Sequence, residues 1–234
     1  MIRAMIETSL IDWDGKLATV LFFDKCNFMC PFCQNWELIL HPHKFPAISW
    51  QEIESKLLAK KGWIDGVVLT GGEPLVYGAE ASKTASRVKE LGLLVKLDTN
   101  GAYPDRLQKL IDEKLVDYVA LDIKAPLDKR YTVAAGKRVE IQKIVKSIAL
   151  LKKEVVDYEL RTTCVPGIIN EEAIKNIGGV IRRAKRWILQ QYVPENAYKK
   201  QYRGLKVITE SEMSRLLELA SNFVTEVRFR GRTH

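Results

Sequence analysis

Long apolar runs and low-complexity tracts are both missing from this sequence. No run of 18 apolar residues occurs, so we expect no membrane-spanning helix. The first residues, MIRAMIETSLIDWDG, meet acidic and polar side chains too early to form the apolar segment of a secretory signal. We therefore expect a cytoplasmic protein, in which thiols stay reduced and clustered cysteines indicate metal or redox chemistry more often than disulfides.

Acidic residues are outnumbered, with 29 Asp and Glu against 37 Lys and Arg, for a formal net charge of +8. The basic runs that stand out are 182–186, 199–203 and 228–232. Such charge is compatible with an anionic partner, including nucleic acid. Most basic residues alternate with acidic ones, however, which is typical of a solvated surface and does not favour nucleic acid.

No Pro/Gly/Ser-rich linker divides the chain, and short apolar runs alternate with amphipathic ones. Strands are predicted over 19–23, 65–70, 93–98, 117–123, 158–165, 187–193 and 224–230. Helices are predicted over 49–61, 79–91, 104–114, 138–153, 171–185 and 210–222, with Ser49, Asn170 and Thr209 suited to cap three of them. This alternation indicates an α/β fold, a parallel sheet covered by helices, and about six units favour a partial (β/α)6 TIM-like barrel over a complete eight-fold one.

The chain has only four cysteines, and three of them, Cys26, Cys30 and Cys33, lie within eight residues. Thiolates ligate iron–sulfur clusters or zinc, and a complete site normally needs four ligands. A cubane of four irons would leave one iron without a protein ligand. An open iron is a substrate site, as is the open position of a catalytic zinc.

Two other interpretations of the cysteines stay open at this point. A zinc site would need a fourth ligand from His41, His43 or the distant Cys164. A redox pair of Cys30 and Cys33 would leave the first cysteine of the loop unexplained. Because free cysteine packs as a small apolar group, we expect Cys164 to be a buried strand residue.

The loop sequence resembles that of the radical S-adenosylmethionine (SAM) enzymes. Their signature is C-x3-C-x2-C with an aromatic residue before the third cysteine, and Cys26, Cys30, Phe32 and Cys33 match it. The resemblance implies a [4Fe–4S] cluster on the three cysteines, with the amino and carboxylate groups of SAM on the open iron. It also implies reductive cleavage of SAM to a 5′-deoxyadenosyl radical, with the electron supplied by an external donor such as flavodoxin or ferredoxin.

A glycine pair follows the strand predicted at 65–70, in the motif TGGEP. Two glycines let the backbone approach a ligand closely, and Glu73 can accept a hydrogen bond from an ammonium group. In the resembled family this motif holds the methionyl amino group of SAM. The resemblance therefore assigns that role to Gly71, Gly72 and Glu73.

Polar residues also end the next two predicted strands, in KLDTNG and LDIKAP. Asp122 and Lys124 are two residues apart and share one face of a strand, where a buried ion pair is the purely structural alternative. The subgroup resembled most is the activating enzymes of glycyl-radical proteins. The resemblance to it places Asp122 and Lys124 at the SAM ribose and carboxylate, and Asp98 at the methionyl end.

The resemblance extends over roughly residues 15–195 and implies further contacts to SAM. Phe32, Asn35 and Val165 match positions that contact adenine in those activating enzymes. The late strand departs from the pattern, because QQY stands where the activating enzymes often place a histidine near the ribose. Gln190 or Gln191 could donate similar hydrogen bonds.

The predicted organisation is one radical SAM domain over residues 1–234, with a core at about 15–195 and a C-terminal extension, 196–234, that completes the fold. Three cysteines on the SAM cluster leave one, too few for a second cysteine-ligated cluster. The resemblance then implies a compact activating enzyme that forms a glycyl radical on a partner such as anaerobic ribonucleotide reductase or pyruvate formate-lyase. The alternatives are a radical SAM enzyme acting on a small molecule, another protein site or tRNA, and a zinc-binding module that holds nucleic acid.

Overall fold

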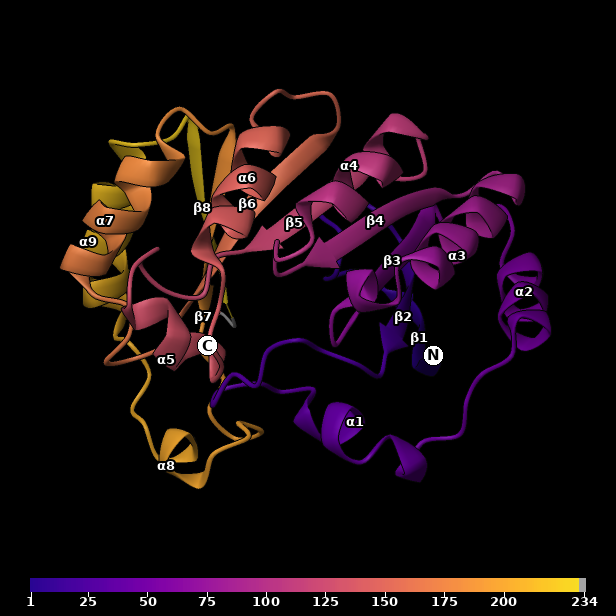
Figure 1. Cartoon of the computed structure of the whole chain (residues 1–234), viewed down its shortest axis with the longest axis horizontal. Helices are drawn as coiled ribbons and strands as arrows, with labels where there is room; N and C mark the ends of the chain where they lie inside the picture. Colours follow the sequence, from indigo (N-terminus) through magenta and orange to yellow (C-terminus); the bar gives the residue numbers. More distant parts are fainter. Residues whose placement is uncertain (232–234) are drawn as a thin grey trace.

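A computed structural model describes residues 1–231, which form an eight-stranded sheet with the strands in sequence order (Figure 1). The strands are β1 (Ile2–Ser9), β2 (Ala18–Phe23), β3 (Gly66–Gly71), β4 (Leu94–Thr99), β5 (Tyr118–Asp122), β6 (Asp157–Cys164), β7 (Arg186–Gln191) and β8 (Glu226–Arg230). Strands β2 to β8 pair in parallel, whereas β1 pairs antiparallel with β2. The seven predicted strands are all present.

The α-helices connect successive strands; in Figure 1 the longer ones flank the sheet, whereas the short α1 and α8 lie below it. They are α1 (Trp36–Leu40), α2 (Trp50–Ala59), α3 (Ala79–Glu90), α4 (Pro104–Asp112), α5 (Arg130–Ala135), α6 (Ile141–Leu151), α7 (Glu171–Ile181), α8 (Lys200–Arg203) and α9 (Glu210–Ser221). Ser49, Asn170 and Thr209 accept hydrogen bonds from backbone N–H groups in the first turns of α2, α7 and α9, as predicted. None of the helices described is long and apolar enough to cross a membrane. Six strand–helix units, β2 to β7, confirm the predicted fold class.

Strand β1 was not expected from the sequence. Its residues are mostly half-buried or exposed, and its pairing with β2 shifts register twice. An edge strand of this kind has no continuous apolar run, so it lacks the pattern that marks the central strands.

The central strands are apolar because helices cover one face and the barrel interior the other. Val67, Leu69 and Leu97, for example, have no exposed surface. Cys164 belongs to this core at 1% exposure, as expected. Since the strands are parallel, the segments that follow β2 to β7 all emerge at one edge of the sheet, and the chemistry-bearing loops gather there.

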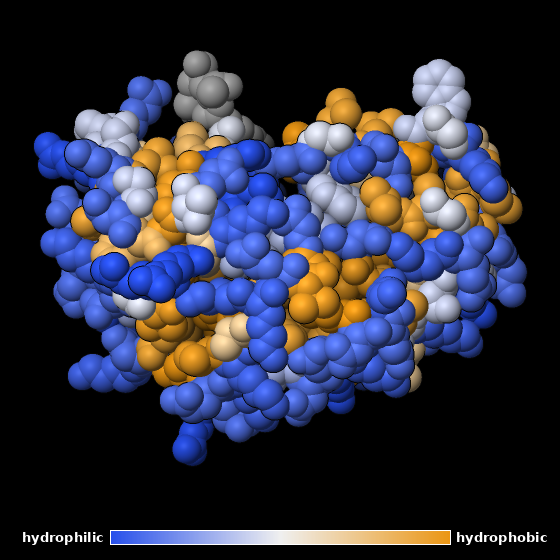
Figure 2. All heavy atoms as spheres, turned by 90° about the horizontal axis from the view of Figure 1, so that it is seen from above, coloured by the Kyte–Doolittle hydropathy of each residue, from blue (hydrophilic) through white to orange (hydrophobic). Residues whose placement is uncertain are grey.

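Basic residues of the C-terminal strands are largely ion-paired. Arg230 contacts Glu159 at 2.9 Å and Asp14 at 3.1 Å, and Arg228 contacts Asp14 at 3.4 Å, so the loop after β1 meets β8. Arg186 contacts Glu226 at 2.7 Å. Figure 2 shows the surface that results on one face, where hydrophilic side chains surround smaller apolar patches. The last residue of the basic run 228–232 lies outside the described residues.

Candidate active site

A cavity of about 920 Å³ opens at the carboxyl edge of the sheet. All three cysteines of the loop line it, together with residues that follow or end β3, β4, β5, β6 and β7. The predicted site residues on its wall are Cys26, Cys30, Phe32, Cys33, Asn35, Gly71, Gly72, Asp98, Asp122 and Lys124. Residues far apart in the sequence are thus brought to one cavity.

The cysteine loop begins at Asp24, whose buried carboxylate accepts hydrogen bonds from Arg3 and Tyr77. Within the loop, the Cys33 amide donates to the Cys30 carbonyl at 3.0 Å, which closes a turn between these two thiols. Farther along the chain, the Lys199 amide donates to the Pro31 carbonyl at 2.9 Å. The loop is therefore fixed at its start and on its outer side before any ligand binds.

The thiols of the loop are poorly solvated. Burial raises the pKa of Cys26 and of Cys30 to about 12, and it raises the pKa of Cys33 as well. The Phe28 amide and the Asn100 side-chain amide approach the Cys26 sulfur at 3.4 Å and 3.9 Å. Hydrogen bonds to sulfur of this kind are usual around metal-bound thiolates.

The glycine pair after β3 packs directly against the cysteine loop. A Cβ atom added at Gly72 would lie 2.1 Å from the Lys25 carbonyl oxygen, and one at Gly71 would lie 2.5 Å from the Phe23 nitrogen. Gly71 also has a φ of 105°, which side chains rarely adopt. Asn35 donates to the Gly71 carbonyl at 2.8 Å. Glycine at 71 and 72 is therefore required for the turn to reach the loop and to present its backbone to the cavity.

Glu73 does not line the cavity. Its carboxylate is fully buried and accepts hydrogen bonds from the Leu75 amide at 3.1 Å, the Thr99 hydroxyl at 2.9 Å and the Asn100 amide at 2.6 Å. Burial raises its pKa to about 7. In this arrangement Glu73 ties the glycine turn to the end of β4.

Charged side chains of alternating sign cross the ends of β4, β5 and β6. Lys124 Nζ contacts Asp122 at 2.8 Å, and Arg161 contacts Asp122 at 2.7 Å and Asp98 at 3.1 Å. Burial alone would raise the pKa of each carboxyl, but the charges of Arg161 and, for Asp122, of Lys124 hold both pKa values below their ordinary range. We call Asp98, Asp122, Lys124 and Arg161 the strand-end charge network.

Arg161 is the member of this network that the sequence did not reveal. The only signal was an arginine in the middle of the predicted strand YELRTTCV, and its partner could not be read without the register. Pairing of β5 with β6 sets Arg161 directly beside Asp122. Charge at a buried strand position could have indicated a functional or structural partner.

One carboxylate oxygen of Asp98 is paired by charge without a well-directed hydrogen bond. The Oδ2 atom of Asp98 accepts from Thr70 at 3.2 Å and from Arg161. The Oδ1 atom is buried 3.2 Å from Lys96 Nζ, yet within residues 1–231 it accepts no well-directed hydrogen bond. The charge of Lys96 therefore compensates this buried oxygen and helps to keep the pKa of Asp98 low.

Comparison with known proteins identifies the family. The model of the radical SAM superfamily matches residues 20–177, about two thirds of the chain. The chain belongs to the radical SAM superfamily. Family membership implies a [4Fe–4S] cluster and SAM.

Relatives of this radical SAM protein include activating enzymes. A Methanocaldococcus jannaschii protein provisionally named a glycyl-radical enzyme activating enzyme is 34% identical over 98% of this chain and 95% of its own length. The pyruvate formate-lyase-activating enzyme of Clostridium pasteurianum is 26% identical over 79% of this chain and 77% of its own. Among solved structures, a domain of pyruvate formate-lyase-activating enzyme from Bacteroides vulgatus matches with a TM-score of 0.55 at 16% identity, over 69% of this chain and 98% of that one. This last likeness concerns the fold.

The residues of this radical SAM protein fit the cofactors that the family implies, a [4Fe–4S] cluster and SAM. Three thiols with nearby amide donors suit a cluster, and the glycine turn on the cavity wall suits a polar ligand beside it. No three His, Cys, Asp or Glu side chains within residues 1–231 are placed to hold a single metal ion.

Two predicted adenine contacts lie on the cavity wall and one does not. Phe32 and Asn35 line the cavity, whereas Val165 has no exposed surface and Thr163 lines the wall in its vicinity. Gln190 and Gln191 both line the cavity, so the late strand offers two amides.

Proposed function

We propose that this radical SAM enzyme is an oxidoreductase that generates a glycyl radical on a partner enzyme. The observation that carries the proposal is the 34% identity, over nearly the whole chain, to a relative provisionally named as such an activating enzyme. The alignment covers 98% of this chain and 95% of that relative, so the likeness includes both the sheet and the loops at its carboxyl edge. We place the enzyme in the cytoplasm as part of the same proposal.

Cys26, Cys30 and Cys33 would hold the cluster, and the strand-end charge network would orient SAM beside it. Lys124 presents an ammonium suited to the SAM carboxylate, and Asp122 presents a carboxylate suited to the ribose hydroxyls. Both are already ionised, because each is held by an opposite charge. Binding then requires no proton transfer at these two groups.

The glycine turn would present backbone oxygens to the methionyl amino group. We assign Gly71 and Gly72 to that contact, and Asp98 to the same end of SAM. Glu73 would act indirectly, because its carboxylate holds the glycine turn in place through the amides of Leu75 and Asn100. Phe32 and Asn35 would border the adenine, with Val165 supporting the wall from the core.

When bound, the cluster and SAM supply the one-electron cleavage that yields the hydrogen-abstracting 5′-deoxyadenosyl group. The protein's part is to keep this chemistry away from water and to admit one target. The cavity wall also includes Ile11, Leu205, Val207, Arg230 and Gly231, to which the proposed SAM contacts assign no role. A glycine Cα lies on backbone, so a substrate loop must enter this space.

The proposal is tested by mixing the reduced enzyme, SAM and a candidate glycyl-radical enzyme of the same organism under strict anaerobiosis. Anaerobic ribonucleotide reductase and pyruvate formate-lyase are the first candidates. Electron paramagnetic resonance should show a glycyl radical on the partner, and the signal should vanish when the radical-site glycine is changed to alanine. If every such partner stays silent while tRNA or a small molecule drives 5′-deoxyadenosine formation, the activating function is wrong and the radical chemistry stands.

A further inference from the structure

Helix α5 lies between β5 and α6, in a segment where the sequence predicted no helix. On one side it contacts the cysteine loop, and on the other it contacts the turn after β5 that carries Asp122 and Lys124. The residues that make these contacts, Tyr131 and Gly136, do not line the cavity. The helix therefore connects two groups of cavity residues from outside the cavity.

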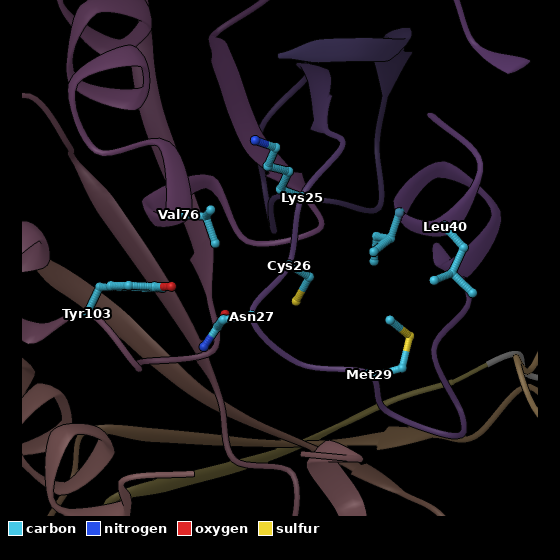
Figure 3. Close-up of a pocket in the computed structure, with 8 residues that line it drawn as sticks. Lys25, Cys26, Asn27, Met29, Leu40, Val76 and Tyr103 are labelled. Atoms are coloured by element: carbon cyan, nitrogen blue, oxygen red, sulfur yellow. The ribbon is translucent and has the colours of Figure 1, made fainter. Parts of the chain in front are cut away.

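The contact with the cysteine loop is made by the backbone at Met29. The Met29 amide donates to the Ala135 carbonyl at 2.8 Å. The Met29 side chain points instead into a small depression of about 260 Å³, which Cys26 and Leu40 also line (Figure 3). Because Met29 directly precedes Cys30, the hydrogen bond to α5 fixes the backbone next to one of the thiols.

Gly136 ends the helix and permits this close approach. Its φ of 65° is left-handed, and a Cβ atom added there would lie 1.9 Å from the Met29 carbonyl oxygen. No side chain fits at this distance, because the oxygen belongs to the backbone and cannot turn aside. The position therefore requires glycine both for its conformation and for its contact with the loop.

Tyr131 makes the second contact of the helix. Its side chain has no exposed surface, and its ring meets Phe28 of the cysteine loop edge-on, with 6.3 Å between the ring centres. Its hydroxyl accepts from the Lys124 amide at 3.3 Å and donates to the Asp122 carbonyl at 3.4 Å. One side chain thus spans from the loop that carries the thiols to the turn that carries Asp122 and Lys124.

The separation between this loop and this turn affects both. Burial raises the pKa of Cys30, and the charge of Lys124 partly offsets that rise. Because the energy between two charges depends on their separation, a shift of the loop against the turn would change this effect. A ligand bound to both would be sensitive as well, since the groups of a binding site must be held to within about 0.5 Å.

We propose that Tyr131 and Gly136 are positioning residues, which hold the cysteine loop against the turn of Asp122 and Lys124 so that SAM contacts the cluster and the turn at once. The inference rests on the proposed cluster and SAM sites. Neither residue is a ligand of the cluster or of SAM in this arrangement. Their loss should therefore let both cofactors bind but misplace one relative to the other.

The test uses the cluster-loaded enzyme and Tyr131→Phe, which keeps the ring against Phe28 and removes only the hydroxyl. Iron content should stay at the wild-type level, and SAM affinity should fall about fivefold, because the Lys124 amide loses its acceptor. At saturating SAM, dithionite-driven formation of 5′-deoxyadenosine should remain about tenfold slower, since even a misplacement of about 1 Å can cost ~100-fold in rate. The change that SAM causes in the electron paramagnetic resonance spectrum of the reduced cluster should also differ from that of the wild type.

Tyr158→Phe is the matched control. Tyr158 is equally buried, and its hydroxyl accepts from the Lys185 amide at 3.0 Å, but neither of these residues lines the cavity. This variant should lose stability in urea unfolding, as Tyr131→Phe does, because it removes the same kind of hydrogen bond. It should keep the wild-type SAM affinity, rate and spectrum, which a purely structural role of Tyr131 would also predict for Tyr131→Phe.

Gly136→Ala is a larger perturbation, and Gly92→Ala is its control. Gly92 also has a positive φ, of 80°, but a Cβ atom added there meets nothing within 4 Å. Gly136→Ala should lower the rate of 5′-deoxyadenosine formation more than Tyr131→Phe does, whereas Gly92→Ala should leave it unchanged. If Gly136→Ala takes up no iron, Tyr131→Phe decides the question.

A wild-type rate and spectrum of Tyr131→Phe at saturating SAM would overturn the inference. Loss of iron from this variant would overturn it too, because the hydroxyl contacts the turn after β5 and not the cysteine loop. The proposed function fails separately, if the wild-type enzyme itself takes up no iron or cleaves no SAM.

Discussion

The cysteine loop and the strand-end charge network line the same cavity but are built in different ways. The loop takes its three thiols from eight consecutive residues, and burial keeps them protonated in the absence of metal. The network takes Asp98, Asp122 and Arg161 from three strands, and each is held ionised by its neighbours. The thiols of the loop become charged only when iron displaces their protons. The strand-end charge network, in contrast, is charged as soon as the sheet forms.

Because of this difference, substitutions in the loop and in the network should have different effects on cofactor binding and on the stability of the fold. The thiols hold no hydrogen-bond network that the fold depends on, so their loss should remove the cofactor and leave the fold. The charged residues neutralise one another within the sheet, so their loss should disturb SAM binding and the fold together.

The largest effect is expected in the loop. Cys26→Ala, Cys30→Ala or Cys33→Ala should each abolish the cluster, because in the proposed site every thiol is one of three protein ligands. Iron analysis and visible absorption after anaerobic reconstitution measure this, with about four irons expected on the wild type. Cys164→Ala is the control and should keep the cluster. Retention of iron by Cys26→Ala together with its loss from Cys164→Ala would reverse the ligand assignment.

The next effect is expected in the network and concerns stability. Arg161→Met removes the buried cation shared by Asp98 and Asp122 and leaves each half-buried carboxylate with one lysine, Lys96 or Lys124. Removing one partner of a buried ion pair typically costs about 3–5 kcal/mol of unfolding free energy. Urea unfolding of the apoprotein measures the change, and Arg215→Met on the surface of α9 should cost less than about 0.5 kcal/mol. Equal stability of Arg161→Met and the wild type would show that the network is not structural.

The two walls also differ in how far the sequence predicts them. The cysteines, Phe32 and the glycine pair could be assigned because their spacing along the chain is itself the signal. Arg161 could not, because its role depends on the register of β5 against β6. Nor could the sequence show that the Glu73 carboxylate is buried and accepts hydrogen bonds from Thr99 and Asn100, since a carboxylate after two glycines can also point into a cavity.

The strands likewise differ in how far the sequence predicts them. The central strands were predicted because both faces are buried and their apolar runs are continuous. Strand β1 was missed because its half-exposed residues leave no such run. Val165 was placed at the adenine by resemblance, but it lies in the core, and neighbouring Thr163 lines the wall instead.

A smaller effect is expected on SAM affinity. Asp122→Ala and Lys124→Ala should each weaken SAM binding by up to about a hundredfold, because each removes a charge-assisted hydrogen bond and leaves its partner unpaired. Iron content should stay at the wild-type level, since neither residue ligates metal. Equilibrium binding of SAM to the cluster-loaded protein measures the affinity, and Lys129→Ala, an exposed lysine, is the control. Normal SAM binding by both variants would require a different place for SAM in the cavity.

The smallest effect is expected at Glu73, which ties the glycine turn to the end of β4, and it concerns the pH dependence of stability. The pKa of Glu73 is about 7 in the folded protein because of burial, against an ordinary value of 4.5. Between these values the folded state binds more protons than the unfolded state, so Glu73 makes stability fall as pH rises. Glu73→Gln cannot titrate and should lack this contribution.

The measurement is urea unfolding of the apoproteins across that range. The unfolding free energy of the wild type minus that of Glu73→Gln should fall by about 2 kcal/mol between about pH 5 and about pH 7. Taking the difference between the two proteins cancels groups that titrate alike in both. The Gln oxygen can keep the bonds from Leu75 and Thr99, which share one carboxylate oxygen, but the NH2 group then faces the Asn100 amide, so a constant offset between the proteins is expected in addition. An offset that does not change with pH would mean that Glu73 is ionised throughout, and that the glycine turn is held to β4 by a permanent charge, as the network is.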